Sequence, residues 1–180
     1  MMYQVKHKQK LADFQPDDLI MSFKKGAKFK DMPPNPIELT WNPENESGTK
    51  ASYYSSGKVL MTKQLVEALY AAGVNNIDVY PVIIHSTLGA KDCSDYVAVN
   101  IVGAIEAVDR EKSEFIYDSG GLFDNIFARM ILDESKINRV LLFRLAEAIS
   151  TVIVHESVVK TLESMGDFGL TFIKSDEYAG

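Results

Sequence analysis

The sequence predicts an α+β fold built mostly of β-sheet. Short runs of β-branched and aromatic residues recur along the chain, and turn-forming residues bound each run. Two stretches are predicted to be helices because their apolar residues recur at helical spacing. Each lies between two strands, which gives two similar strand–helix–strand units, at about 59–84 and 152–174, flanking a central run of strands. A length of 180 residues suits a single domain, 1–180.

The N-terminal third has the least regular pattern. Residues 1–10 alternate weakly between apolar and lysine-rich positions, which predicts an edge strand, where lysines discourage unwanted pairing. Segment 24–57 is predicted to be largely irregular, because its prolines and glycines interrupt a regular ladder. Within it, residues 37–41 are predicted to form a short strand. A long irregular segment of this kind is a common place for a function-specific surface.

The first strand–helix–strand unit begins with a predicted strand at 59–61. Thr62 is predicted to cap the following helix, whose apolar face consists of Leu65, Val66, Leu69 and Ala72. Gly73 is placed to end that helix. Residues 77–84 are predicted to form the second strand, and Pro81 within it indicates an edge or a bulge.

The central run is predicted to consist of strands. Residues 96–103 and 105–108 are strand candidates, and a turn at 109–113 before a strand at 114–117 predicts a hairpin. Ser119, Gly120 and Gly121 form a second break. Residues 126–132 and 140–145 are predicted strands, although the first of these also fits a helical period.

The C-terminal unit repeats the first at an offset of 93 residues. A strand at 152–154 precedes a helical face, Gly166 ends that helix, and a strand follows at 170–174. The two helical faces align without a gap, since Leu65, Val66, Leu69, Ala72 and Gly73 correspond to Val158, Val159, Leu162, Met165 and Gly166. This offset has two possible explanations. Either the unit was duplicated, and the two helices lie in equivalent positions on a shared sheet, or the common strand–helix–strand arrangement arose twice independently.

Charge and cysteine content favour an intracellular protein with an acidic surface. The formal net charge of −6 is uneven, because the first 30 residues carry +4 and the remainder −10. The acidic part is either an ordinary solvated surface or a face that meets a basic partner. A single cysteine, Cys93, permits no internal disulfide and fits a reducing compartment. No signal-like or membrane-spanning apolar stretch is seen, so a cytoplasmic location without membrane association is expected.

The sequence contains no assembled catalytic motif. Phosphate-loop and dinucleotide fingerprints do not occur, and the His and Cys spacing does not suit a metal site, so neither a cofactor nor a metal is expected. A small hydrolase could be built only around His85, His155 and Cys93, and it would need a pocket holding at least two of them. For His155, which lies near a helix start, a capping or packing role is favoured over base catalysis. The lysine-rich N-terminus does not outweigh the acidic remainder, so no nucleic-acid partner is expected.

From Val59 onward, an ordered set of features resembles immunity protein family eleven of bacterial polymorphic toxin systems, formerly a domain of unknown function. Each feature is degenerate alone, and the order carries the resemblance. The features are the strand 59–61 with its helix ending at Gly73, then 79–82, 95–100, Val108-Asp109 leading to Ser113, 132–136, 142–145, and finally 152–155 with its helix and Gly166.

The resemblance implies an antitoxin that binds and blocks a cognate protein toxin, encoded by an adjacent gene, without catalysis. The binding surface is expected on the acidic face and the irregular segment, at Asp118, Asp124, Asp133, Glu134 and Trp41. A partly buried Arg144 is expected to form a structural ion pair with Asp109 or Asp133. Two alternatives stay open: the small hydrolase above, and an adaptor domain that homodimerises through an exposed strand edge.

Overall fold

The computed structural model describes residues 1–7, 26–41, 46, 50–55, 59–121 and 124–177. Its longer helices are α2 (Lys63–Ala71) and α3 (Glu156–Met165), and two 3₁₀ turns are η2 (Glu134–Lys136) and η3 (Ser175–Glu177). The strands are β1 (Met2–His7), β2 (Ile37–Thr40), β3 (Tyr53–Tyr54), β4 (Leu60–Thr62), β5 (Ile77–His85), β6 (Tyr96–Ile101), β7 (Ala104–Ile105), β8 (Glu114–Tyr117), β9 (Ile126–Arg129), β10 (Leu142–Leu145), β11 (Ala148–His155) and β12 (Leu170–Lys174).

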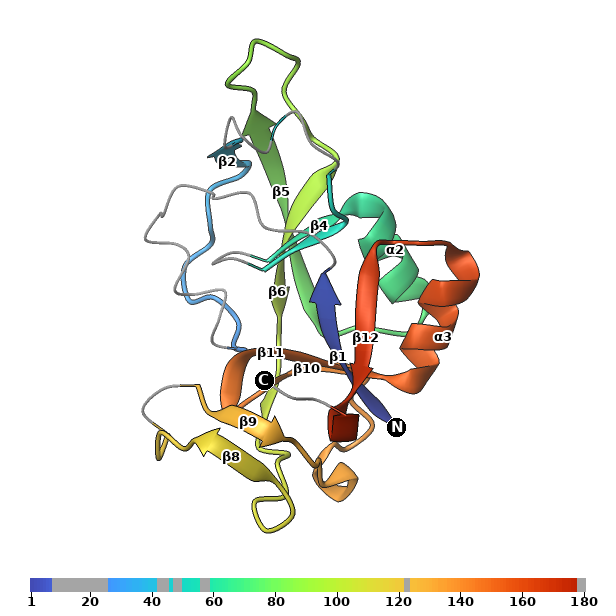
Figure 1. Ribbon diagram of the computed structural model, residues 1–180. Helices are drawn as coiled ribbons and strands as arrows, with labels where there is room; N and C mark the ends of the chain where they lie inside the picture. Colours follow the sequence, from blue (N-terminus) through green and yellow to red (C-terminus); the bar gives the residue numbers. More distant parts are fainter. Residues whose placement is uncertain (8–25, 42–45, 47–49, 56–58, 122–123, 178–180) are drawn as a thin grey trace.

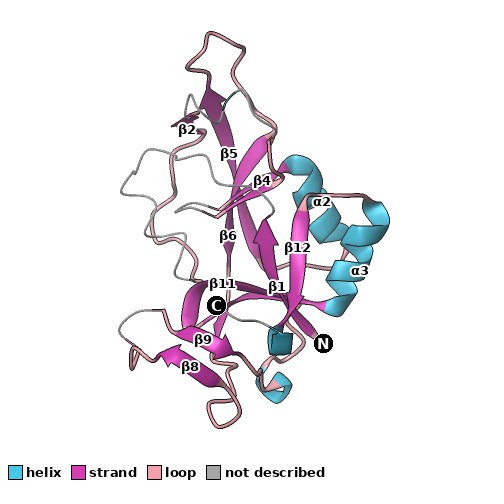
Figure 2. Ribbon diagram, viewed as in Figure 1, coloured by secondary structure: helices cyan, strands magenta, loops and turns pink. Residues whose placement is uncertain are grey.

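The described strands form two five-stranded sheets and one separate hairpin. The first sheet has the order β12-β1-β11-β10-β7, the second has the order β2-β5-β6-β4-β3, and β8 pairs with β9. The helices α2 and α3 contact each other and lie on one side of the molecule, while the β8–β9 hairpin lies at the lower end of the view (Figures 1 and 2). The predicted α+β fold, mostly sheet with two strand–helix–strand units, is therefore confirmed.

Each sheet contains a split strand–helix–strand unit. In the second sheet β4 and β5 both run antiparallel to β6, which lies between them, and α2 connects β4 to β5. In the first sheet β11 and β12 both run antiparallel to β1, and α3 makes the same connection. The predicted edge strand at the N-terminus is thus wrong, because β1 pairs on both sides and fills the gap between two parallel strands.

The registers of the two units also correspond. Val79 pairs with Val99, and its counterpart Phe172, 93 residues later, pairs with Val5, which is 94 residues before Val99. The same two offsets relate all the other pairs of β5 with β6 to those of β12 with β1. The units occupy separate sheets, so the expected shared sheet is wrong, but the matching registers support an internal duplication whose middle strands come from different parts of the chain.

Local side chains determine where both helices begin and end. The Thr62 hydroxyl accepts a hydrogen bond from the Leu65 amide at 3.3 Å, as the sequence predicts. His155 caps α3 in the equivalent position, because its Nδ1 accepts from the Ser157 amide at 3.1 Å. After α2, Gly73 has a φ of +90°, a conformation that costs little without a Cβ atom. The caps explain why two short helices have sharp limits.

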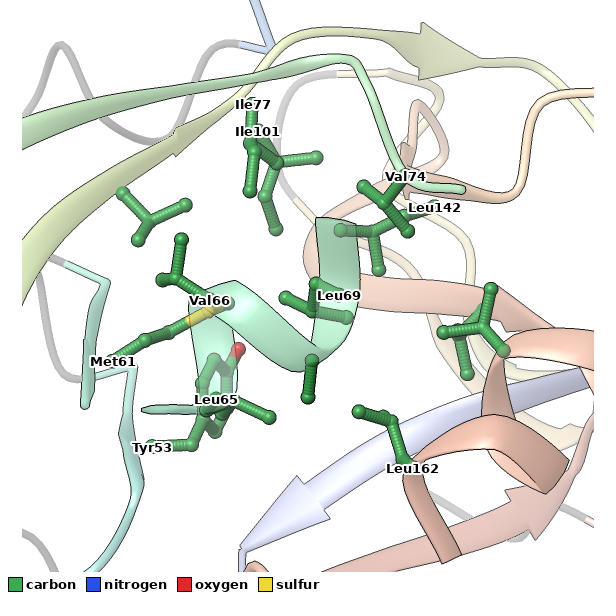
Figure 3. Packing of buried hydrophobic residues seen from close by; sticks show 14 of the residues in the cluster. Tyr53, Met61, Leu65, Val66, Leu69, Val74, Ile77, Ile101, Leu142 and Leu162 are labelled. Carbon is green, nitrogen blue, oxygen red and sulfur yellow. The ribbon is translucent and has the colours of Figure 1, made fainter. Parts of the chain in front are cut away.

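The main hydrophobic core lies between the two units and is shared by them. Leu65, Val66 and Leu69 of α2 pack in one cluster with Val158 and Leu162 of α3. Figure 3 shows Leu69 and Leu162 within this cluster, beside side chains from β4, β6 and β10. Full burial of an aliphatic side chain stabilises by roughly 1.5–3 kcal/mol, so the two helical faces are a major source of stability.

In the central run, pairing between distant segments contradicts two predictions, the hairpin between 105–108 and 114–117 and the helical alternative for 126–132. The 114–117 strand does not form a hairpin with 105–108; instead β8 pairs with β9, and Val108 forms an isolated bridge with Leu132. The residues before and after the 109–113 turn therefore both pair with the segment 126–132. The strand prediction for 126–132 is confirmed at Ile126–Arg129, and the helical alternative is wrong, because Phe127 is buried while its neighbours face outward.

Pro81 lies where β5 changes partners. Residues 77–81 pair with β6, and residues 82–85 pair with β2. Proline donates no ladder hydrogen bond, so it is tolerated where the β2 ladder has not yet begun. Of segment 24–57, the described parts contain the short strands β2 and β3 among irregular backbone, and the predicted strand at 37–41 is confirmed as β2.

Candidate partner-binding surface

An acidic concavity lies at the base of the β8–β9 hairpin. It has a volume of about 620 Å³ and is formed by the 106–111 segment, the hairpin loop, η2 and the turn between β10 and β11. Five carboxylate side chains line it against two cationic ones. These are Glu106, Asp109, Glu111, Asp133 and Glu147, with Arg110 and Lys136. We refer to this site as the acidic concavity.

Two of these carboxylates are held in the charged form by neighbouring donors. Asp109 accepts a hydrogen bond from Lys112 Nζ at 2.6 Å, and this contact is the main cause that lowers the pKa of Asp109. Asp133 caps η2 and accepts from the Ser135 hydroxyl at 2.6 Å, which likewise lowers its pKa. Both side chains therefore carry a full negative charge at neutral pH.

Glu147 ties two walls of the concavity together. Its Oε1 accepts from the Val108 amide at 2.9 Å and so ties the β10–β11 turn to the 106–111 segment. Its Oε2 is buried and has no hydrogen-bond partner among the described residues.

The four acidic residues that the sequence predicts for partner binding lie around this region, and each contacts other residues of the chain. Asp118 forms an ion pair with Arg110 on the concavity rim. Asp124 lies before β9, and its carboxylate accepts from the Ile149 amide at 2.7 Å and the Ser150 amide at 3.0 Å. Glu134 is exposed and lies 3.6 Å from the terminal amino group of Met1. Of the four acidic residues, Asp133 alone is part of the lining.

Trp41 does not share this surface. Its side chain is 3% exposed and belongs to the second core cluster. Its ring packs edge-on against Tyr96, with centroids 5.9 Å apart, and against Tyr54 at 6.3 Å. The expectation that Trp41 contacts a partner is therefore wrong, since a core residue offers a partner almost no surface. The sequence reasoning had placed Trp41 on the binding surface only because it lies in the irregular segment 24–57.

The predicted ion pair between Arg144 and Asp109 is also wrong. Arg144 is buried in β10, where its Nη1 donates to the Ile149 carbonyl at 2.9 Å. Burial lowers the pKa of Arg144, and the nearby charge of Asp124 opposes that shift. Asp109 instead pairs with Lys112, three residues further along its own turn. Asp133, the other partner considered, pairs with Lys136 at 3.9 Å.

Of the three residues of the hydrolase alternative, His155 lies apart from the other two. His85 ends β5, and its Nδ1 lies 2.9 Å from Asp92 Oδ2. Cys93 is close to it in the fold, because Ile84 and Cys93 form a bridge. His155 caps α3 in the other sheet and lines a cavity with Met2, Glu134 and Val140, which contains neither His85 nor Cys93. The capping role expected for His155 is confirmed.

Sequence reasoning missed most of the concavity. Glu106, Glu111 and Glu147 line it but were not among the predicted partner-binding residues. The density of acidic residues between 106 and 118 was a usable signal, whereas the approach of Glu147 depends on the pairing of β10 with β7. Among the described residues, no group of His, Cys, Asp and Glu is arranged to hold a metal ion, and no helix is long and apolar enough to span a bilayer.

Comparison with known proteins identifies the family. The sequence model described as Immunity protein family (Imm11) matches residues 3–177, which is nearly the whole chain. A comparison with curated proteins found no match.

Proposed function

The chain belongs to the Imm11 immunity protein family, and we propose that it protects a cell by binding a cognate toxin and blocking it. The observation that carries this proposal is the family match over residues 3–177. Members of such a family are typically non-enzymatic inhibitors, so this chain is one as well. The inhibitor works by occlusion: it covers a surface that the toxin needs and performs no reaction.

Electrostatics support a basic toxin surface as the target. The acidic concavity presents five carboxylates against two cationic side chains, and those of Asp109 and Asp133 are ionised at neutral pH. Fields of this kind accelerate the encounter between oppositely charged proteins and select among partners, and salt weakens both effects. A stable complex of this class buries roughly 1,600 Å² in total, so the interface extends beyond the concavity.

The proposed setting is the cytoplasm of the cell that makes the toxin. A single cysteine, Cys93, fits a reducing compartment, and an inhibitor must be present wherever its toxin is first made. The toxin is proposed to be a domain encoded by a neighbouring gene.

The test is co-expression of the chain with the toxin domain encoded beside its gene. Growth is expected to be restored when the chain is present and lost when the toxin is expressed alone. The matched control is the same chain carrying Leu69→Ala and Leu162→Ala, which removes two buried leucines from the core and is expected to lower protection by lowering the folded fraction. Unchanged killing with the folded wild-type chain, for every neighbouring toxin candidate, would refute the proposal.

A further inference from the structure

The β8–β9 hairpin exposes an apolar surface. Ile116, Tyr117 and Ile126 are 62%, 50% and 46% exposed. Tyr117 and Ile126 are direct partners in the ladder, and Ile116 forms the bulge between Phe115 and Tyr117. Three large apolar side chains are thus gathered on four-residue strands, at the end of the molecule away from α2 and α3 (Figure 1). We refer to these three residues as the hairpin patch.

The core holds the opposite face of the hairpin in place. The tilted rings of Phe115 and Phe127 pack with centroids 4.9 Å apart; Phe127 belongs to the third hydrophobic cluster, and Phe115 packs against it. The Ser113 hydroxyl also accepts from the Ile131 amide at 2.9 Å. Two-stranded sheets are marginal alone, so these anchors explain why the hairpin is ordered with its outer side chains uncovered. Gathered apolar side chains on a surface are typical of interaction sites.

The hairpin patch is continuous with the acidic concavity. Arg110, which lines the concavity, packs over the Phe115 ring at 4.9 Å and pairs with Asp118 directly after β8. The hairpin loop at Gly120 and Gly121 lines the concavity as well. Asn125, another lining residue, directly precedes Ile126. Among the described residues, the hairpin patch and the acidic concavity therefore adjoin at the two ends of the hairpin loop, where Asp118 follows Tyr117 and Asn125 precedes Ile126.

We propose that this combined surface is where the toxin docks, and that the toxin presents an apolar side chain flanked by lysine or arginine. The proposal rests on the proposed function and names the site that performs it. The apolar side chain packs on Tyr117 and Ile126, and the cationic side chain enters the acidic concavity, which is lined by five carboxylates. Charge complementarity favours a basic partner over a second copy of this chain, whose own acidic concavity would be repelled.

The first experiment compares two tyrosines of equal exposure. Tyr117 is 50% exposed on the hairpin, and Tyr70 is 49% exposed on α2. Binding of an inactivated form of the neighbouring toxin domain is measured by calorimetry for Tyr117→Glu and for the control Tyr70→Glu. The hairpin variant is expected to bind at least about tenfold more weakly, as truncation of a central aromatic contact commonly does. The control is expected to bind within about twofold of the wild type.

The second experiment tests the charge with residues whose side chains make no described hydrogen bond. Glu106→Lys combined with Glu111→Lys reverses two exposed charges of the concavity, and Glu67→Lys combined with Glu163→Lys reverses two exposed charges on the helices. The concavity pair is expected to slow association and to flatten its salt dependence, whereas the helix pair is not. These substitutions are exposed and leave the core intact, so they test the docking site even if the Tyr117→Glu variant does not fold.

The outcomes separate this inference from the proposed function. A wild-type chain that neither binds nor neutralises the toxin refutes the function. A wild-type chain that binds, while both hairpin-side variants bind within twofold of it, overturns the docking site and leaves the function standing. A wild-type chain that is dimeric by light scattering, and that Tyr117→Glu converts to a monomer with full toxin binding, would make the hairpin a self-association surface and also overturn the proposal.

Discussion

Replacement of Asp124 is expected to destabilise the fold, although sequence reasoning placed this residue on a binding surface. Its carboxylate accepts from the Ile149 amide at 2.7 Å, from the Ser150 amide at 3.0 Å and from the Ser150 hydroxyl. These bonds hold the start of β11 beside the start of β9. Asp124 also supplies a negative charge that supports buried Arg144.

The size of the effect follows from the exposure of each partner. Hydrogen bonds to a charged group contribute about 1.5–3 kcal/mol when partly buried, and Ile149 is half-buried. Ser150 is exposed, so water replaces its lost bonds at little cost. With the charge near Arg144 included, Asp124→Ala is expected to lower the free energy of unfolding by about 2–4 kcal/mol. Asp124→Asn keeps one acceptor oxygen and is expected to lower it by about half as much.

Urea denaturation followed by circular dichroism measures this change, since a shift of the midpoint without a change in slope reports stability. The matched control is Asp118→Ala, which removes an exposed ion pair with Arg110 and is expected to cost less than about 1 kcal/mol. An Asp124→Ala variant within about 0.5 kcal/mol of the wild type would refute the structural role. If that variant also bound toxin less tightly, Asp124 would belong to the interface instead.

Three further outcomes test the fold and its charges. Leu69→Ala and Leu162→Ala are each expected to lower the free energy of unfolding by about 3 kcal/mol, since both leucines are buried at equivalent positions in one core; a difference of more than about 2 kcal/mol in urea denaturation would contradict the equivalence. Thr62→Ala is expected to cost about 1 kcal/mol by loss of the α2 cap, and an unchanged midpoint would contradict the cap. Lys112→Met is expected to raise the pKa of Asp109 toward its usual value of 3.8 in an NMR titration, because the Lys112 hydrogen bond is the main cause of its lowering. The stability from Asp109 is accordingly present above that value and lost as pH falls through the lower folded-state pKa, and a pKa that does not move in the variant would contradict this cause.

Local chemistry was readable from the sequence. The apolar faces that begin at Leu65 and Val158, the cap at Thr62 and the break at Gly73 lie where their spacing predicts them. The prediction is wrong for Met165, which is 49% exposed at the end of α3. Each of the confirmed features depends on residues within about one helical turn, so a single short stretch contains the information. The match at 93 residues also proved informative, because the pairing registers of the two units repeat it.

Pairing between distant segments was not readable in the same way. The strand at Met2–His7 looked like an edge because of its lysines, yet it fills the gap between β11 and β12. Trp41 was expected at the binding surface because it lies in the irregular segment 24–57, yet two tyrosines from other strands bury it. Arg144 was correctly expected to be buried, but its neighbours depend on the β10–β11 register. In each case the outcome depends on strand neighbours that local patterns do not specify.

Titration of purified, active toxin with the purified chain tests the central claim most directly. A blocking protein is expected to abolish toxin activity at one chain per toxin, with the toxin recovered intact and active after the complex is separated in denaturant and the toxin is refolded. Full inactivation by far less than one equivalent, or a covalently altered toxin, would show catalysis and contradict occlusion. Toxin activity that stays unchanged at a saturating excess of the chain would contradict inhibition altogether.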